Sequence, residues 1–296
     1  MVFLCVFLPA VFCLHLLLPG MRAKNFLLVV ASLVFYAYGE PIYVILLVAS
    51  SAGNYILARL TGECPKIRKF TMTLAVVVNL GLLVIFKYSG FLVETFNSVT
   101  GAGIPVPQVR MPIGISFFTF QALSYVIDVY RGDASVQKNF GKVLLYISFF
   151  PQLIAGPIVK YHDVEAEINN RKQTPEEIGK GIRRFIAGLS KKVLIANTMG
   201  LVADNLFGAA ASGITGPGAW LGAVSYMLQI YFDFSGYSDM ALGLGMMFGF
   251  HFHENFNYPY ISASIREFWR RWHMSLSGWF KEYLYIPLGG SRRGKF

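Results

Sequence analysis

The amino-acid sequence predicts an all-α, polytopic integral membrane protein. Of its 296 residues, 55% are hydrophobic and only 14% are charged, whereas soluble domains carry about 25% charged residues. Apolar runs long enough to cross, or nearly cross, a hydrocarbon layer of about 30 Å recur along the chain. Because every backbone polar group inside lipid must be satisfied within the protein, we expect these runs to be helices.

Eight apolar runs are expected to lie in the membrane. They are Val2–Leu18, Asn25–Tyr38, Ile42–Leu60, Phe70–Tyr88, Pro112–Val129, Val143–Val159, Phe185–Leu206 and Trp220–Phe250. The last run is too long for one crossing, so we expect two segments, with Gly236, Gly243 and Gly245 breaking the run or packing closely against a neighbour. The first run lacks a cationic start and a small-residue cleavage site, which indicates a retained span.

The distribution of Lys and Arg indicates that Val143–Val159 is not a simple span. Basic loops flank this run on both sides, at Arg131–Lys142 and Lys160–Lys192, although positive charge in short loops marks the cytoplasmic side only. The run also contains Pro151 and Pro157. We therefore expect a re-entrant or bent hairpin, and irregular backbone at this depth is tolerated only against protein or a watery cavity.

The polar segment that follows is expected to lead from the cytoplasmic surface into the membrane. In "TPEEIGKGIRRFIAGLSKK", Thr174 suits the N-cap of a helix, Pro175 suits its first position, and acidic residues fill its first turn. The sequence contains no internal repeat, low-complexity tract or linker. A single membrane-embedded domain over residues 1–296 is therefore predicted.

The net charge of +10 is explained by basic loops that contact anionic lipid headgroups. No basic stripe occurs outside a hydrophobic context, so membrane lipid is an expected partner and nucleic acid is not. The cysteines, Cys5, Cys13 and Cys64, are odd in number and lack metal-type spacing, which indicates packed or free thiols. His251 and His253 have no third ligand nearby, so no metal site is predicted.

Two carboxylates, Asp233 and Asp239, lie within the last apolar run. A charge at the centre of a bilayer costs about 2.5–3.5 kcal/mol, so such residues face a cavity or pair with a cation. We expect a cavity wall or a partner for a buried arginine rather than a general base. Hydrogen bonding between helices, together with Ser235, Tyr237 and Ser238, is an equally good explanation.

The stretch Arg266–Phe280, "REFWRRWHMSLSGWF", places one histidine among three tryptophans and three arginines. A continuous helix from Ile261 to Lys281 would have an apolar stripe and a polar, basic stripe, with His273 at the seam between them. The apolar stripe contains Ile261, Ile265, Phe268, Trp272, Leu276 and Trp279, with Trp269 and Phe280 at its edge, and the basic stripe contains Arg266, Arg270, Ser277 and Lys281. Such a helix lies at an interface or lines the mouth of a cavity.

Two interpretations of this stretch remain open on physical grounds. Desolvation and nearby cations would both keep the His273 imidazole neutral, as a general base requires. Arg266, Arg270 and Lys281 would then attract the phosphates of coenzyme A or of a phosphopantetheine arm. Alternatively, Trp and Arg simply form a belt at the depth of the lipid headgroups.

A longer stretch resembles the membrane-bound O-acyltransferase family, in particular the bacterial branch that includes the membrane component of alginate O-acetylation. The resemblance is carried by "YFDFSGYSDMALGLGMMFGFHFHENFNYPYISASIREFWRRWHMSLSGWFKEYLYIPLGGSRRG", and also by "MPIGISFFTFQALSYVIDVYRG" and "FFPQLIAGPIVKY". It implies a ring of helices around a central tunnel, with re-entrant and amphipathic segments, in the bacterial cytoplasmic (inner) membrane.

The resemblance also implies acyl transfer without a bound cofactor. The substrates would be an acyl-thioester donor, acetyl-CoA or an acyl-carrier phosphopantetheine, and a hydroxyl of an exported polysaccharide, reached directly or through an extracytoplasmic acetyltransferase partner. His273 matches the first of the family's two histidines and is the expected catalytic residue. Residues expected to line the tunnel are Asp233, Ser235, Asp239, Trp269, Arg270, Trp272 and Ser277.

One part of the family pattern is missing from the sequence. The family's second histidine, in a Trp-His-Gly type motif, would lie beyond "YIPLGGSRRG", whereas the sequence ends at Phe296. We therefore expect either a C-terminally incomplete chain or an inactive shortened protein, and the 296 residues are not expected to catalyse alone. The alternative function is a non-catalytic membrane conduit, or a scaffold that docks an extracytoplasmic transferase.

Overall fold

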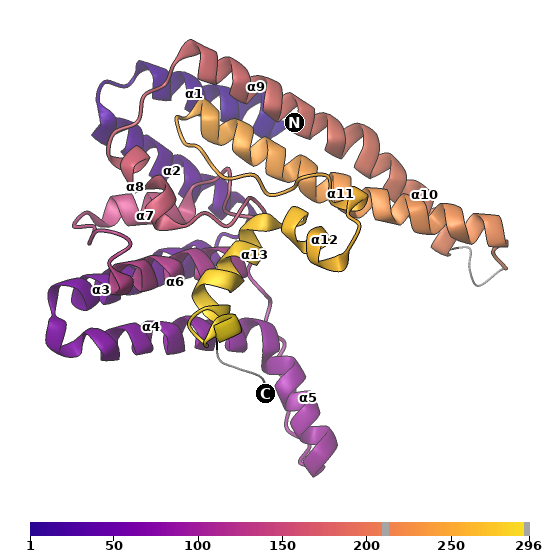
Figure 1. The fold of residues 1–296 in the computed structure, drawn as a ribbon, viewed down its shortest axis with the longest axis horizontal. Coiled ribbons are helices and arrows are strands. Elements are labelled where there is room, and N and C mark those ends of the chain that lie inside the picture. The colour runs from indigo at the N-terminus through magenta and orange to yellow at the C-terminus, as the bar shows by residue number, and fades with distance from the viewer. Residues whose placement is uncertain (209–212, 293–296) are drawn as a thin grey trace. The chain divides into compact units, whose positions relative to one another are not determined.

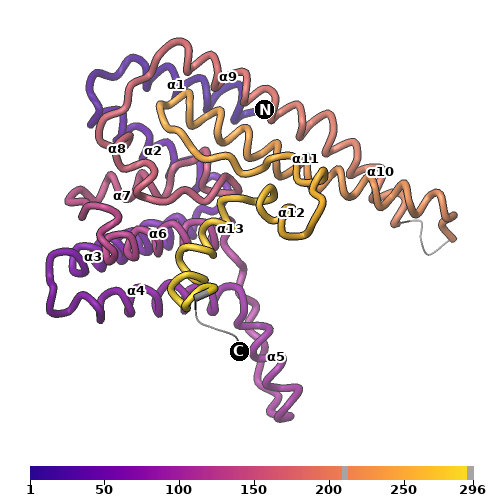
Figure 2. Tube along the Cα trace, in the orientation of Figure 1, coloured from indigo at the N-terminus to yellow at the C-terminus, as the bar shows by residue number. Residues whose placement is uncertain are grey.

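The computed structural model describes residues 1–208 and 213–292, and its regular elements within these ranges are all helical. The chain forms two compact units, shown as a ribbon in Figure 1 and as a Cα trace in Figure 2. The first unit comprises Met1–Ile154 and Ile158–Arg171, and the second comprises Ala155–Pro157 and Lys172–Phe296. The all-α prediction is confirmed for the described part of the chain.

The first unit contains the helices of the first five predicted runs. Its elements are η1 (Phe3–Phe7), α1 (Leu8–Leu17), α2 (Met21–Gly39), α3 (Tyr43–Glu63), η2 (Pro65–Ile67), α4 (Arg68–Leu83), η3 (Val84–Tyr88), α5 (Ser89–Thr100), α6 (Ile115–Arg131), α7 (Phe140–Ser148) and α8 (Tyr161–Asn169). Helix α3 packs against α4, α6 and α7, and α2 packs against α7. Tyr36, Phe118, Tyr125 and Phe150 are among the largest side chains buried in this unit.

The prediction that Val143–Val159 is bent, and so is not one continuous helix, is confirmed. Helix α7 ends at Ser148, and regular helix resumes only at Tyr161. The irregular backbone between them is held by protein groups: the Phe150 N–H donates to Ser32 Oγ over 3.0 Å, and Gln152 Nε2 donates to the Tyr146 carbonyl over 2.8 Å. Protein donors and acceptors thus take the place of the missing helical hydrogen bonds.

The second unit is built around a long helical hairpin. Its elements are α9 (Pro175–Ser190), η4 (Lys191–Ala196), α10 (Asn197–Gly208), α11 (Gly216–Met247), η6 (Pro259–Ile261), α12 (Ile265–Arg271), α13 (Met274–Phe280), η7 (Lys281–Tyr285) and η8 (Gly290–Arg292). Figures 1 and 2 show α11 running back along α9 and α10. The predicted start of α9 is confirmed, because Thr174 and Glu177 form a capping box with Pro175 at the first helical position.

Helix α11 is continuous, so the prediction of two segments in Trp220–Phe250 was wrong. Of the two roles expected for its glycines, close packing is confirmed for Gly236 and Gly243. A Cβ atom added at Gly188 of α9 would lie 2.5 Å from the Gly236 carbonyl oxygen of α11, and one added at Gly181 would lie 2.6 Å from the Gly243 carbonyl oxygen. Only glycine permits the two backbones to approach this closely.

Four helices in the described ranges are long and apolar enough to cross a membrane. They are Met21–Gly39, Tyr43–Glu63, Pro65–Thr100 and Pro175–Gly208, and the shorter apolar helix Phe3–Leu17 precedes them. Such segments are typical of a multi-pass membrane protein.

Candidate functional site

His273 stands at a break between two short helices. Helix α12 ends at Arg271 and α13 begins at Met274, while His273 adopts the left-handed conformation, with φ 44° and ψ 53°. The single helix predicted from Ile261 to Lys281 was therefore wrong. A non-glycine residue in this conformation costs about 1–3 kcal/mol and persists only where its surroundings enforce it.

Two backbone hydrogen bonds from a distant segment enforce the break. The Asn257 N–H donates to the Arg271 carbonyl over 2.9 Å, and the Met274 N–H donates to the Asn255 carbonyl over 2.9 Å. These bonds pair residues 255–257 with the chain on either side of His273. The histidine side chain is thereby fixed relative to the segment that follows α11.

The side-chain amide of Asn255 fixes the tautomer of His273. Asn255 is 1% exposed, and its Oδ1 accepts from the Ser275 backbone N–H at 3.2 Å and from Ser275 Oγ at 2.9 Å. A backbone N–H can only donate, so the amide atom facing it must be oxygen. His273 Nδ1, 3.1 Å from the same oxygen, must then carry a proton. The neutral ring consequently presents an unprotonated Nε2.

Burial keeps this imidazole neutral. The Phe234 ring packs against it at a centroid distance of 4.7 Å and an interplanar angle of 78°. Desolvation lowers the pKa of His273 to about 4, because an apolar environment disfavours the imidazolium form. Desolvation was one of the two causes expected from the sequence, and it accounts for the lowered pKa, whereas the nearby cations do not contribute to it.

An aromatic cluster anchors α12 against α11. The Trp272 ring lies 5.1 Å from that of Phe256, 5.6 Å from that of Phe268 and 6.2 Å from that of Tyr231. The Tyr260 hydroxyl donates to the Met227 carbonyl of α11 over 2.9 Å. Aromatic pairs of this kind contribute about 0.5–1.5 kcal/mol each beyond their buried area.

A cavity of about 470 Å³ lies beside this segment. Its lining comes from α9, η4, α11, the chain after α11 and the start of α13, and consists of Arg184, Lys191, Tyr231, Ser235, Ser238, Asp239, Glu254, Asn255, Phe256, Asn257, Tyr258 and Met274. Asn255 and Met274 connect the cavity to His273, the first as its hydrogen-bond partner and the second as its neighbour in the chain. The volume is within the range of small-molecule sites.

An ion network forms one wall of the cavity. Arg184 Nη2 lies 2.8 Å from Asp239 Oδ1, and Lys191 Nζ lies 2.6 Å from Asp239 Oδ2. The Arg184 guanidinium also donates to both carboxylate oxygens of Glu254. Asp239 thus pairs with an arginine and lines a cavity, which are the two roles expected of a carboxylate in an apolar run.

The structure brings together only some of the expected site residues. Ser235 and Asp239 line the cavity, whereas Asp233 is half-exposed and pairs with Lys192. Trp272 belongs to the aromatic cluster, Trp269 is 53% exposed, and Ser277 Oγ donates to the Trp269 carbonyl over 3.2 Å.

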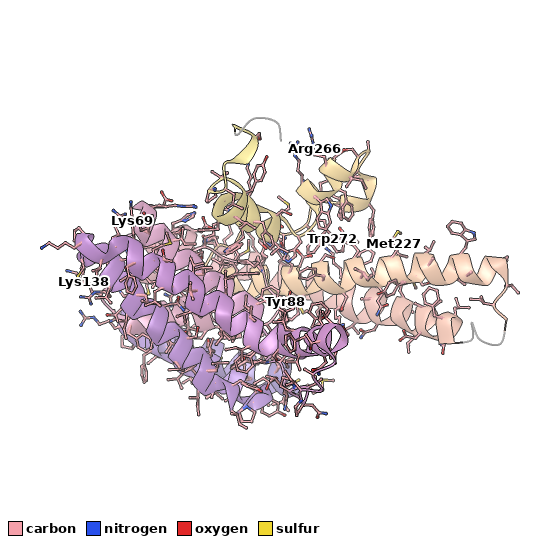
Figure 3. The ribbon with its side chains drawn as sticks, turned by 90° about the horizontal axis from the view of Figure 1, so that it is seen from below. Lys69, Tyr88, Lys138, Met227, Arg266 and Trp272 are labelled. Atoms are coloured by element: carbon pink, nitrogen blue, oxygen red, sulfur yellow. The ribbon has the colours of Figure 1, made fainter. Side chains whose placement is uncertain are left out.

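The three cations expected to bind the phosphates of the donor lie outside the cavity lining. Arg266, Arg270 and Lys281 are all exposed. In Figure 3, Arg266 extends from α12 away from α11, whereas Trp272 lies on the side nearer α11. These cations are available to an anionic group at the surface, either a lipid headgroup or a phosphate of a ligand.

Sequence reasoning missed the basic residues and the amide of the site. Arg184 and Lys191 are seven residues apart in the continuous helical stretch of α9 and η4, which places them on one face, and this spacing was a usable signal. Asn255 carried no such signal, because its role depends on the fold of residues 255–275.

Within residues 1–208 and 213–292, no three His, Cys, Asp or Glu side chains gather in a way that would hold a metal ion.

Comparison with known proteins gives consistent matches. Residues 133–296 match the membrane-bound O-acyltransferase (MBOAT) family. The chain is 46% identical over 301 residues to a Pseudomonas syringae pv. tomato protein named "Probable alginate O-acetylase AlgI", covering 99% of the chain and 58% of that protein. It is 38% identical over 324 residues to the Helicobacter pylori "Peptidoglycan O-acetyltransferase", covering 98% of the chain and 61% of the relative.

A more distant relative is the Bacillus subtilis "Teichoic acid D-alanyltransferase", 32% identical over 180 residues, with 59% of the chain and 45% of the relative covered. The chain spans about three fifths of the length of the O-acetylating relatives. With the family match over more than half of its residues, and with apolar helices typical of a multi-pass membrane protein, the chain belongs to the membrane-bound O-acyltransferase family.

Proposed function

We propose that the native protein transfers acetyl groups from a thioester donor to hydroxyl groups of an exported polysaccharide. The observation that carries this proposal is the contact between His273 Nδ1 and Asn255 Oδ1, which favours a proton on Nδ1 and so an unprotonated Nε2 in the neutral ring. Burial, which lowers the pKa of His273 to about 4, favours that neutral form. Family membership and the names of the O-acetylating relatives support the same reaction class.

In the proposed reaction, the acceptor hydroxyl oxygen attacks the thioester carbonyl carbon. The carbon–sulfur bond breaks, and the hydroxyl proton ends on the departing sulfur. With a pKa of about 4, His273 is a weak base, so its Nε2 is better suited to accept a hydrogen bond from the hydroxyl than to remove its proton. We propose that His273 orients the hydroxyl, and that the second histidine of the family pattern serves as the main base.

The substrates and location follow from the family. The donor would be acetyl-CoA or an acyl-carrier phosphopantetheine on the cytoplasmic side of the bacterial inner membrane. Its phosphates would meet the exposed cations Arg266, Arg270 and Lys281. The acceptor would be an alginate-like or related polysaccharide, reached directly or through an extracytoplasmic acetyltransferase partner.

The test is acetyl transfer in membrane vesicles that contain the native gene product. Vesicles would receive radiolabelled acetyl-CoA or acetylated carrier protein together with the polymer made by the same cells, and the label in the polymer would be counted. His273→Ala should lower the label about 100-fold, since misplacing a reacting group by about 1 Å can cost about 10²-fold in rate. Membrane insertion and detergent-solubilised size should remain as in the wild type.

Asp233→Ala serves as the matched control, because this carboxylate is half-exposed and lies outside the cavity lining. Its acetyl transfer should stay within about twofold of the wild type. Full polymer labelling by His273→Ala vesicles would refute the catalytic role and favour a conduit or scaffold that docks an external transferase.

A further inference from the structure

A basic pocket of about 360 Å³ lies at one end of the first unit. Its lining consists of Pro65 and Lys66 of η2, Arg68 and Lys69 of α4, and Tyr130 of α6. Among the described residues of this lining, three are cations and none is acidic. A concave surface with charge of one sign concentrates ions of the other sign. The pocket therefore favours an anionic ligand.

The carboxylate that precedes the pocket in the sequence is engaged with another cation. Glu63, the last residue of α3, pairs with Arg59 of the same helix at 2.7 Å, and Arg59 Nη2 donates to Glu63 Oε2 over 2.8 Å. This pair is neutral as a whole. The charge of Lys66, Arg68 and Lys69 is thus left for a ligand or for solvent counterions to balance.

Tyr130 holds the Arg68 side chain in the wall of the pocket. The Arg68 guanidinium lies 4.8 Å from the centroid of the Tyr130 ring and donates through Nη2 to the Tyr130 carbonyl. Within residues 1–208 and 213–292, no group hydrogen-bonds to the buried Nε atom of Arg68. A planar guanidinium with N–H donors to spare is suited to bind phosphate oxygens in pairs. The pocket therefore contains a pre-positioned phosphate ligand.

The pocket lies at the depth of the lipid headgroups. Helix α3 is long and apolar enough to cross a membrane, and so is the stretch Pro65–Thr100 that follows it. The 21 residues of α3 extend about 31 Å at 1.5 Å per residue, which matches a hydrocarbon layer of about 30 Å. The short connection between the two spans, which lines the pocket, therefore lies at the membrane surface.

The distribution of charge identifies the leaflet. Short loops that are rich in Lys and Arg lie on the cytoplasmic side of a membrane. The connection after α3 is such a loop, whereas the turn before α3, residues 39–42, contains Glu40 and no Lys or Arg. Figure 3 shows Lys69 and Lys138 toward one end of these helices and Tyr88 toward the other. The pocket thus faces the cytoplasmic leaflet, which carries a negative surface potential.

An exposed apolar stripe begins beside the pocket and continues along α4. Phe70, Leu74 and Val77 are exposed, and their spacing of four and three residues places them on one face of the helix. The stripe starts at the residue after Lys69 and runs toward the membrane interior. The acyl chains of a lipid would cover this surface, whereas a soluble phosphate compound would not. This arrangement favours a lipid as the source of the phosphate.

We infer that this pocket binds the phosphate of an anionic phospholipid of the cytoplasmic leaflet. Arg68 receives the phosphate, Lys66 and Lys69 balance its charge, and the acyl chains follow the stripe on α4. General attraction between a basic loop and a negative membrane requires neither a cavity nor an arginine held by Tyr130. Because the lining comes from the α3–α4 connection and from α6, the bound lipid links these elements.

Lipid titration of the purified native protein in detergent tests the inference, with bound molecules counted by native mass spectrometry. The probes are dioleoyl phosphatidylglycerol, dioleoyl phosphatidylcholine, which has the same chains and no net charge, and coenzyme A, which has phosphates and no acyl chains. Phosphatidylglycerol should bind about tenfold more tightly than phosphatidylcholine, and Lys66→Gln combined with Lys69→Gln should abolish this preference, because each lysine near an anionic surface contributes about fivefold in affinity. Phosphatidylglycerol should also raise the unfolding temperature of the wild type, since a ligand stabilises the state that binds it.

Two further variants distinguish a built site from diffuse surface charge. Lys87→Gln removes an exposed lysine from the same helical stretch, about 27 Å from Lys69 at 1.5 Å per residue. It should change the Kd of phosphatidylglycerol by less than about twofold, because exposed charges more than about 10 Å apart are largely screened at 0.1 M salt. Arg68→Lys keeps the charge and loses the planar fork, so it should weaken binding about fivefold, as expected for one lost hydrogen bond.

Thermal unfolding without added lipid checks that each variant is folded, and the lysine variants change only exposed side chains. The inference fails if phosphatidylglycerol binds no more tightly than phosphatidylcholine, or if the double lysine variant retains the wild-type affinity. Equal affinities of Arg68→Lys and the wild type would reduce the pocket to surface charge and also refute it. Coenzyme A binding that requires Lys66 and Lys69, without such dependence for phosphatidylglycerol, would assign the pocket to a soluble phosphate compound instead. None of these measurements requires acyl transfer, so their outcome is independent of the proposed function.

Discussion

The Nδ1 atom of His273 lies 3.1 Å from the Oδ1 atom of Asn255, although the two residues are 18 positions apart in the chain. The same oxygen accepts two hydrogen bonds from Ser275. One buried side-chain amide thus orients the ring and determines which ring nitrogen is unprotonated. The chemistry proposed for His273 depends on this arrangement.

Asn255→Ala should impair catalysis by removing the group that orients His273. We expect acetyl transfer to fall about 10- to 100-fold, because the ring gains freedom and the Nε2–H tautomer becomes accessible. Asn255→Asp retains an oxygen that accepts hydrogen bonds from His273 and Ser275, so this variant should recover most of the activity near neutral pH. Its carboxylate favours the imidazolium form, so the acid limb of the pH–rate profile should move upward. Equal rates for Asn255→Ala and the wild type would exclude a positioning role.

The pH dependence should reflect the burial of His273. Because the pKa of this ring is about 4 when folded and about 6.5 when exposed, the neutral form persists down to about pH 5, and no loss of kcat/KM from its protonation is expected near pH 6. Phe234→Ser would admit water to the ring, raise its pKa and lower kcat/KM at pH 5–6. Phe234→Leu keeps the ring dry and should retain the wild-type profile. Identical profiles for the two variants would contradict burial as the cause.

The same pKa difference affects stability. Between about pH 6.5 and pH 4 the unfolded chain binds a proton at His273 and the folded protein does not, so the contribution of this residue to stability falls as the pH is lowered. His273→Gln should therefore flatten the decrease of the unfolding temperature over this range. Thermal unfolding in detergent at several pH values measures this dependence for the wild type and for His273→Gln. Parallel curves of unfolding temperature against pH would contradict the lowered pKa of His273.

The two carboxylates of α11 should differ in their effect on stability. Asp239 holds Arg184 and Lys191 in a partly buried network. Asp239→Ala should therefore lower the free energy of unfolding by about 1–3 kcal/mol, which is less than the loss of a fully buried ion pair costs because solvent screens these charges. Asp233 makes one half-exposed pair, with Lys192, and Asp233→Ala should cost less than about 1 kcal/mol. Thermal unfolding of both variants gives the comparison, and the opposite order would refute the structural role of the network.

The glycine contacts between α9 and α11 predict a similar contrast. A methyl group at Gly188 would lie 2.5 Å from the Gly236 carbonyl oxygen, whereas one at Gly179 of the same helix meets nothing closer than 3.8 Å. Gly188→Ala should therefore destabilise the hairpin by about 1–3 kcal/mol. Gly179→Ala should be neutral or stabilising by up to about 1 kcal/mol, because alanine favours helix. Equal unfolding temperatures for the two variants would argue against the close approach.

Local signals predicted much of the helical framework. The Thr174 cap, the apolar run of α3 and the prolines after α7 each act over a few residues, and the structure confirms all three. The continuity of α11 was missed because glycines that permit close packing cannot be told from glycines that end a helix without knowledge of the neighbouring helix. That neighbour is α9, about 50 residues earlier in the chain.

The site was harder to predict for the same reason. His273 was identified from its surroundings in the sequence, but helical periodicity placed it inside one helix. The bonds from Asn255 and Asn257 that break that helix join segments far apart in the chain. Asp239 was recognised as a buried charge, yet its partners Arg184 and Lys191 lie on another helix, and the sequence contains no direct sign of that pairing.

The most direct test of the central claim is the ¹⁵N spectrum of the histidine rings in the native protein, with His273 assigned by comparison with His273→Asn. We expect a neutral His273 ring with a protonated Nδ1 and an unprotonated Nε2 from pH 7 down to about pH 5. An imidazolium signal at pH 6, or a proton on Nε2 at neutral pH, would contradict it.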